Sequence, residues 1–133
     1  MGSWGYDSFE NDDALDFVGE LCDGADLTPV VRVLTDVVET GENYLEAPPS
    51  SAAIPAAEVI AALKDAPNSN LPDDVLEWIG KYHPVVTDEL VNLSLTALAR
   101  IKSDSELKEL WDETDNADSW YQAINNLEKR LNG

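Results

Sequence analysis

Residues 85–101 read VVTDELVNLSLTALARI, a long stretch rich in Val, Leu and Ile. The apolar side chains recur at helical spacing and would cover more than half of the circumference of a helix. A helix that is apolar over so much of its surface is surrounded by other helices in a folded domain. This segment is therefore predicted to be the central helix of the protein.

Two amphipathic segments lie near the beginning of the chain. Asn11 or Asp12 caps the first predicted helix, which Gly24 would end in the left-handed conformation that glycine tolerates. The second starts at Thr28-Pro29, where a cap residue precedes a proline at the first helical position. Each segment is predicted to be a helix that buries one face.

Prolines help to delimit the next two predicted helices. Residues 42–50, which end in Ala-Pro-Pro-Ser, are predicted to form a loop. The alanine-rich residues 51–65 are predicted to be helical, with Pro55 tolerated because it lies within the first turn. A further short helix is predicted to start at residues 72–74 and to end ahead of Pro84.

Two more helices are predicted after the central one. Ser103 and Glu106 have the spacing of a capping box and would start the first of them. A polar break at residues 115–118 separates it from a last amphipathic helix. The segments together predict an all-α fold, a compact irregular or orthogonal bundle of six or seven short helices. We expect one domain, residues 1–133, with the aromatic residues 1–10 as an ordered, irregular segment packed on it.

Charge is the outlying property of the composition. The chain has 27 Asp and Glu residues against 8 Lys and Arg residues, a net charge of −19. Such a field repels nucleic acid phosphates and anionic lipids, and it attracts basic proteins. We therefore expect no direct binding to nucleic acid. The alternative is that the acidic groups only form a solvated surface.

The chain lacks the sequence features of membrane and exported proteins. No stretch has the roughly 20 apolar residues that a membrane span requires. No basic region followed by an apolar run stands at the beginning of the sequence, as it would in a signal peptide. Cys22 is the single cysteine, so no intrachain disulfide can form. A cytoplasmic location is expected, with no membrane partner.

Few residues are candidates for catalysis. Cys22 and His83 are the only cysteine and histidine, and they are far apart in the sequence. Nucleophilic catalysis would need them in contact. We expect Cys22 to be a buried, small apolar-like residue and His83 to lie at a helix end, near the negative end of the dipole. No catalytic residue and no cofactor is assigned.

One segment has a partial likeness to a calcium loop. Residues 112–118 read DETDNAD and place side-chain oxygens at alternating positions. Ala117 stands where that loop needs glycine, and Ala123 stands where it needs a bidentate glutamate. The segment therefore favours a solvated turn between helices, and no metal site is assigned.

The beginning of the chain resembles a known family. Residues 2–14, GSWGYDSFENDDA, have its pattern of Gly, any residue, Trp-Gly, three variable residues, Phe, an acidic Asn-Asp stretch and Ala. This pattern resembles the start of the bacterial domain-of-unknown-function family 4259. Less specific similarity continues through residues 52–63 and 107–111. The resemblance implies a helical, cytosolic bacterial protein, from a set similar in size and acidity to the immunity proteins of polymorphic toxin systems. It implies no catalytic residue.

These features favour a binding protein over an enzyme. We interpret the chain as an acidic protein-interaction domain, of the immunity or inhibitor type, that binds a basic partner such as a toxin. A carboxylate- or metal-dependent enzyme, a nucleic-acid mimic and a structural domain remain alternatives. Acids that do not start predicted helices are the candidate binding residues, together with an aromatic residue of the first segment. They are Trp4, Glu39, Glu42, Glu46, Glu77, Glu109, Asp112, Glu113, Asp115 and Asp118.

Overall fold

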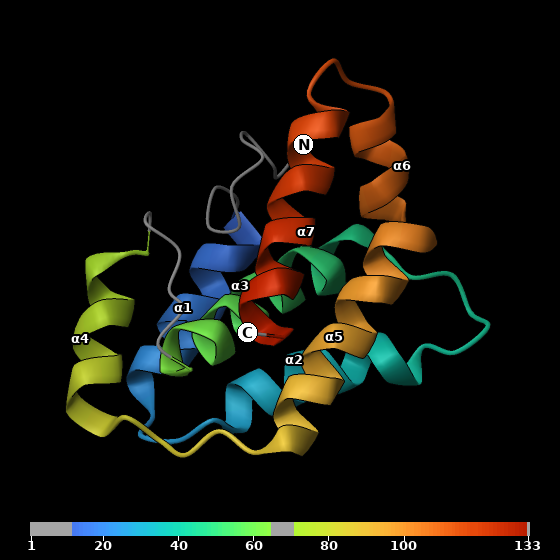
Figure 1. Ribbon diagram of the computed structural model, residues 1–133. Coiled ribbons are helices and arrows are strands. Elements are labelled where there is room, and N and C mark those ends of the chain that lie inside the picture. The colour runs from blue at the N-terminus through green and yellow to red at the C-terminus, as the bar shows by residue number, and fades with distance from the viewer. Residues whose placement is uncertain (1–11, 65–70, 133) are drawn as a thin grey trace.

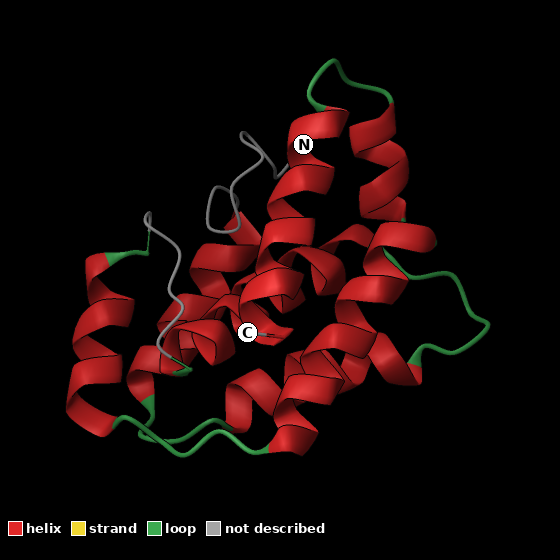
Figure 2. Ribbon diagram, viewed as in Figure 1, coloured by secondary structure: helices red, strands yellow, loops and turns green. Residues whose placement is uncertain are grey.

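The computed structural model describes residues 12–64 and 71–132, which form seven helices (Figures 1 and 2). In chain order these are α1 (Asp12–Asp23), α2 (Thr28–Glu39), α3 (Ala47–Leu63), α4 (Asp73–Tyr82), α5 (Asp88–Ser103), α6 (Glu106–Asp112) and α7 (Ala117–Asn132). No strand occurs in these two ranges. The predicted all-α fold, an irregular bundle of short helices, is confirmed. Residues 1–10, predicted to pack on the bundle, lie outside the described residues.

Helix α3 is the centre of the bundle, and it contacts each of the other six helices. Thirteen of its seventeen residues are buried. Many of them are alanines, and small side chains at a contact let neighbouring helix axes approach closely. A helix of this composition can therefore be surrounded on all sides without leaving gaps.

The prediction that residues 85–101 form the central helix was wrong. Helix α5 begins only at Asp88, after Thr87, whose side chain accepts a hydrogen bond from the backbone N–H of Leu90 at 3.2 Å. Val85 precedes the helix and is 83% exposed. The buried residues of α5 are Ser94, Ala97, Leu98 and Ile101. Its other large apolar side chains are only half-buried. Ten of the seventeen residues 85–101 are apolar, against ten of the twelve residues 52–63 in α3, so the alanine-rich segment is the one that is apolar on all sides.

The start of α3 also differs from the prediction. Residues 42–50 were predicted to be a loop, but the helix begins at Ala47. Pro48 and Pro49 are accommodated in the first turn, where backbone N–H groups have no helical partner. Pro55 therefore lies inside the helix rather than in its first turn. The N–H group of Ala47 is instead satisfied by Glu106, whose carboxylate accepts it at 2.8 Å.

Two predicted helix caps were wrong. Gly24 does not adopt the left-handed conformation; in the described part of the chain, positive φ angles occur at Gly41 (58°) and His83 (37°). His83 ends α4, so its predicted place at a helix end is confirmed.

The second wrong cap is the capping box of Ser103 and Glu106, which does not form. Helix α6 is capped by Ser105, whose hydroxyl accepts a hydrogen bond from the N–H of Lys108 at 3.0 Å.

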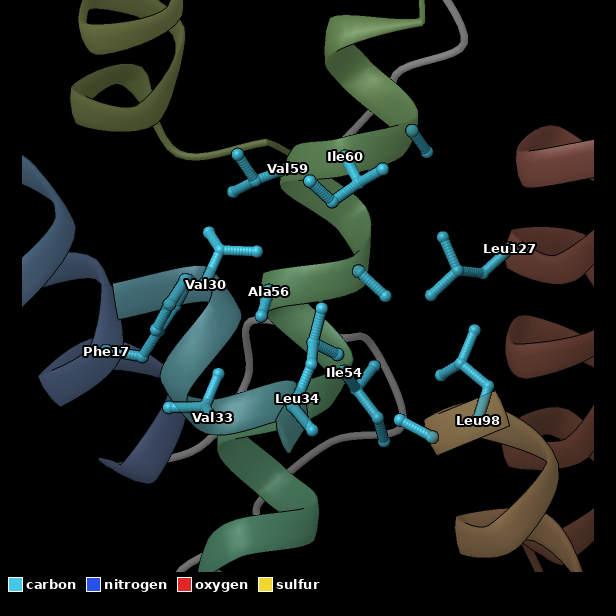
Figure 3. Close-up of a cluster of buried hydrophobic side chains, with 14 of the residues drawn as sticks. Phe17, Val30, Val33, Leu34, Ile54, Ala56, Val59, Ile60, Leu98 and Leu127 are labelled. Atoms are coloured by element: carbon cyan, nitrogen blue, oxygen red, sulfur yellow. The ribbon is translucent and has the colours of Figure 1, made fainter. Parts of the chain in front are cut away.

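The core surrounds α3 (Figure 3). Side chains of α1 and α2 pack on one side of α3, and Leu98 of α5 and Leu127 of α7 lie on the other. Helices α6 and α7 are joined by the stacked rings of Trp111 and Trp120, whose centroids are 6.3 Å apart. None of the helices in the described ranges has the length and hydropathy that crossing a membrane would require.

Candidate functional site

The acidic residues predicted to bind a partner gather mainly where α6 turns into α7. Glu109 lies on α6, Glu113 caps its end, Asp115 lies in the turn and Asp118 lies in the first turn of α7. With Asp112 they form what we call the acidic end, and all five are exposed. Figure 1 shows this turn projecting from the bundle. A partner could therefore approach it without obstruction from the other helices.

Asp112 organises one part of the acidic end. Its carboxylate accepts a hydrogen bond from Lys108 at 2.7 Å and another from the hydroxyl of Tyr121 at 2.9 Å. These two bonds hold the pKa of Asp112 below its usual value, and the bond from Lys108 has the larger effect. The pKa of Tyr121 is raised, first by burial and then by its bond to Asp112. Helices α6 and α7 are thus tied together on their polar side as well as through their tryptophans.

A second contact brings the segment before α3 to the acidic end. The hydroxyl of Tyr44 donates a hydrogen bond to Glu109 at 2.7 Å, which raises the pKa of Tyr44 to about 12. Glu46, which follows Tyr44 by two residues in the sequence, is exposed. The guanidinium of Arg100 binds the carbonyl oxygens of Gly41 and Asn43, and so fixes the loop that carries Glu42. Glu42 and Glu46 therefore lie on a segment held against α5 and α6.

The remaining predicted residues do not join this group. Glu39 is the last residue of α2, and Glu77 lies on α4. Helix α4 does not contact α6 or α7, and Figure 1 shows it on the opposite side of the bundle. Trp4 lies outside the described residues. The structure thus divides the predicted set between the acidic end and separate positions.

A small pocket, which was not predicted, lies between α1 and α4. Its volume is about 200 Å³, and it is lined by Cys22, Asp74, Glu77, Trp78, Lys81 and Tyr82. The five α4 residues recur at helical spacing, so they share one face of that helix. The sequence could have indicated this part of the pocket, because acidic and aromatic residues share one face of the predicted helix. It could not have indicated that Cys22 also lines the pocket, because Cys22 lies 52 residues before Asp74 in the chain.

Cys22 is exposed, so the prediction of a buried cysteine was wrong. Its Sγ lies 3.7 Å from the backbone oxygen of Asp74. The side of the thiol that faces α4 is partly shielded from water; this partial burial, and then the charges of Asp74, Asp23 and Glu77, raise the pKa of Cys22. A raised pKa keeps the sulfur protonated at neutral pH, whereas a nucleophilic cysteine must be a thiolate. The pocket therefore does not activate Cys22 for catalysis.

An ion pair between α3 and α7 is buried in the bundle. Glu58 of α3 is fully buried, and its Oε1 accepts a hydrogen bond from Arg130 of α7 at 2.6 Å. A carboxylate in an apolar core needs such a partner, because an unpaired buried charge is costly. A single glutamate within an alanine-rich segment was the sequence signal for this pair.

No group of three or more Asp, Glu, His or Cys side chains with the arrangement of a metal site occurs within residues 12–64 and 71–132. Residues 112–118, with their partial likeness to a calcium loop, form the end of α6, a turn and the start of α7.

A family model described as a domain of unknown function, DUF4259, matches residues 2–123. The chain belongs to this family. The match spans α1 to α6 and the first part of α7, so the DUF4259 region includes both the acidic end and the pocket. The resemblance drawn from the first residues of the sequence is therefore confirmed. No curated protein and no solved structure matches the chain.

Proposed function

We propose that this DUF4259 protein is a cytoplasmic protein-interaction domain whose acidic end binds a basic protein partner. In this role it resembles an immunity or inhibitor protein that covers a basic toxin. The observation that carries the proposal is the surplus of exposed carboxylates where α6 meets α7. From residue 104 to residue 118 the chain has seven acidic residues and one basic residue, Lys108.

The charge balance of the whole bundle supports this proposal. Five of the eight basic side chains pair with carboxylates of described residues. Lys64 donates to the backbone oxygen of Leu131, and Lys81 lies over the ring of Tyr82. Few basic groups are therefore left to neutralise the exposed acids. A field of one sign around a protein speeds the approach of a partner with the opposite charge by about 10-fold to 1,000-fold.

The other candidate functions gain less support. A nucleic-acid mimic needs carboxylates in a regular row along one face. Exposed acids outside the acidic end instead lie on several separate helices, for example Asp16 on α1, Asp36 on α2 and Glu77 on α4. An enzyme would need an activated group, and the raised pKa of Cys22 works against that role.

The proposal can be tested with charge reversals at the acidic end. The test variant combines Glu113→Lys, Asp115→Lys and Asp118→Lys. The control combines Asp16→Lys, Asp36→Lys and Asp88→Lys, three exposed positions elsewhere in the bundle. Both variants change the net charge equally, and each removes one acid from the first turn of a helix, Asp118 of α7 or Asp88 of α5.

Basic proteins encoded by neighbouring genes would be purified and titrated with each variant by calorimetry. We expect binding by the wild type and the control, and a loss of about 100-fold or more in the test variant, because each reversal replaces an attraction with a repulsion. The absence of binding by every such protein at low salt would contradict the proposal. Equal binding by the test variant and the control would contradict it as well.

A further inference from the structure

The pocket between α1 and α4 is open to solvent and has a mixed lining. Asp74, Trp78 and Tyr82 are spaced four residues apart on α4, and Cys22 at the end of α1 forms the opposite wall. Its volume of about 200 Å³ has room for the head of a long side chain.

The aromatic part of the pocket already interacts with a cation. Nζ of Lys81 lies 5.1 Å from the centre of the Tyr82 ring, within the range of a cation–π interaction. The ring of Tyr82 is 5.6 Å from that of Trp78, and the residue is 38% exposed. Trp78 is fixed by a hydrogen bond from its Nε1 to the backbone oxygen of Gly24 at 2.9 Å. Trp78 is only 4% exposed, so the ring of Tyr82, which packs against it, is the aromatic surface that a cation can reach.

The carboxylates of the pocket are available to a ligand. Asp74 and Glu77 are exposed, and neither forms an ion pair with another residue that the structure describes. Partial burial is the first cause of the raised pKa of Cys22, and the negative charges of Asp74, Asp23 and Glu77 add to it. These three carboxylates make the potential at the pocket negative. This potential disfavours phosphate and carboxylate ligands and favours a cation. Lys81 supplies the one positive charge in the lining.

We propose that this pocket binds an organic cation, the guanidinium or ammonium group of an Arg or Lys side chain. The exposed ring of Tyr82, which packs against the buried ring of Trp78, would contact the cation, and Asp74 and Glu77 would pair with it. The identity of the carrier rests on the proposed function, in which a basic protein partner presents the side chain. Lys81 occupies the aromatic face in the free protein and would move aside when the side chain enters.

The direct test uses the full chain, labelled with ¹⁵N, and small probes in place of the partner. N-acetyl-arginine methylamide and N-acetyl-lysine methylamide supply the two cations, and N-acetyl-citrulline methylamide is a neutral match for arginine. At low salt, we expect a cationic probe to shift the signals of the Trp78 indole N–H and the Cys22 amide, and citrulline to leave them unchanged. Equal shifts with citrulline would overturn the inference. Equally large shifts of the backbone amide signals of Glu113 and Asp118, far from the pocket, would also overturn it.

Variants of the lining sharpen this test. Asp74→Asn with Glu77→Gln should weaken binding of the cationic probe about tenfold, since two charge pairs of up to about 1 kcal/mol each are lost. Lys81→Gln should strengthen binding about threefold, because the competing internal cation, worth about 0.5–1 kcal/mol at an exposed ring, is removed. Asp36→Asn with Glu39→Gln on α2 is the matched control and should leave binding unchanged.

An unchanged affinity in the Asp74 and Glu77 variant, or a weaker one in Lys81→Gln, would overturn the proposed site. Failure of the two proposals can be told apart. If the probes do not bind but a basic protein still binds at the acidic end, the cation pocket is refuted and the proposed function stands. If the probes bind and no basic protein does, the proposed function is refuted and the cation pocket stands.

Discussion

The carboxylate of Glu106 accepts a hydrogen bond from the backbone N–H of Ala47 at 2.8 Å, across 59 residues of chain. The N–H of Glu106 in turn donates to the carbonyl oxygen of Leu45 at 2.8 Å. Ala47 is the first residue of the central helix, where a donor lacks a helical partner and a negative charge is favourable. The first turn of α6 thus supports the N-terminus of α3.

Replacement of Glu106 should therefore destabilise the protein. We expect Glu106→Ala to lower the free energy of unfolding by about 1–2 kcal/mol, because the N–H of Ala47 loses its acceptor. Glu106→Gln retains an acceptor oxygen and should cost about half as much. Urea unfolding followed by circular dichroism measures both changes. The control Asp36→Ala, at an exposed position, should stay within about 0.5 kcal/mol of the wild type. If the Glu106→Ala variant were as stable as this control, the hydrogen bond between Ala47 and Glu106 would not contribute to the stability of the protein.

The central position of α3 can be tested by enlarging one of its alanines. Ala57 is fully buried, so Ala57→Leu should cost about 1–3 kcal/mol through overpacking. Ala99 of α5 is exposed, and Ala99→Leu should change the stability by less than about 0.5 kcal/mol. Thermal unfolding of the two variants compares them directly. If Ala99→Leu proved the more damaging change, α5 rather than α3 would be the central helix.

Because Glu58 and Arg130 form a buried pair, we expect a single substitution in the pair to lower the free energy of unfolding much more than the double substitution does. Arg130→Met leaves the carboxylate of Glu58 in the core without this partner and should cost about 3–5 kcal/mol. Glu58→Met combined with Arg130→Met removes both charges and should be clearly more stable than Arg130→Met alone. Denaturant unfolding of the four proteins of this cycle gives the coupling energy. Simple additivity of the two single changes would mean that the pair does not interact.

The contact between Tyr44 and Glu109 predicts a pH effect in alkaline solution. The pKa of Tyr44 in the folded protein is raised from 10.0 to about 12, mainly because its hydroxyl donates to the Glu109 carboxylate. A raised folded pKa gives a stability contribution that is complete below pH 10 and is lost as the pH rises towards 12. The difference in stability between the wild type and Tyr44→Phe should therefore narrow over this interval.

Selective NMR labelling of tyrosine would measure this ionisation at Tyr44 directly. Glu109→Gln should bring the pKa of Tyr44 back towards 10, because the carboxylate charge is removed. Glu113→Gln, which removes a nearby charge that does not bind Tyr44, serves as the control. A titration of Tyr44 near pH 10 in the wild type would exclude the hydrogen bond in solution.

Helical periodicity predicted the class of fold and most of the helices, but not which of them is central. The Val and Leu residues at 85–101 suggested burial, yet burial depends on how many neighbours pack around a helix. Alanines at 53, 56, 57 and 61 form the more enclosed surface because they let other helices approach. The start of α3 was unpredictable for a related reason. Its first N–H group is satisfied by Glu106, which no local pattern at residues 42–50 reveals.

The candidate site was predictable only in part. Exposure of the acids at residues 109–118 followed from their polar surroundings in the sequence. Their contact with Tyr44 depends on tertiary structure, as does the pairing of Cys22 with α4. Cys22 was predicted to be a small, buried, apolar-like residue, but at the end of α1 it lines the pocket. Distant segments that meet in space leave no spacing signal in the chain.

The association rate with a basic partner tests the proposed role of the acidic end most directly. Stopped-flow mixing would measure this rate at several salt concentrations for the wild type and the two triple charge reversals. We expect the reversal at Glu113, Asp115 and Asp118 to slow association about tenfold or more at low salt, and the control at Asp16, Asp36 and Asp88 to slow it much less. Added salt should remove most of this difference. Equal rates for the two variants would show that only net charge matters, and would contradict a binding surface at the acidic end.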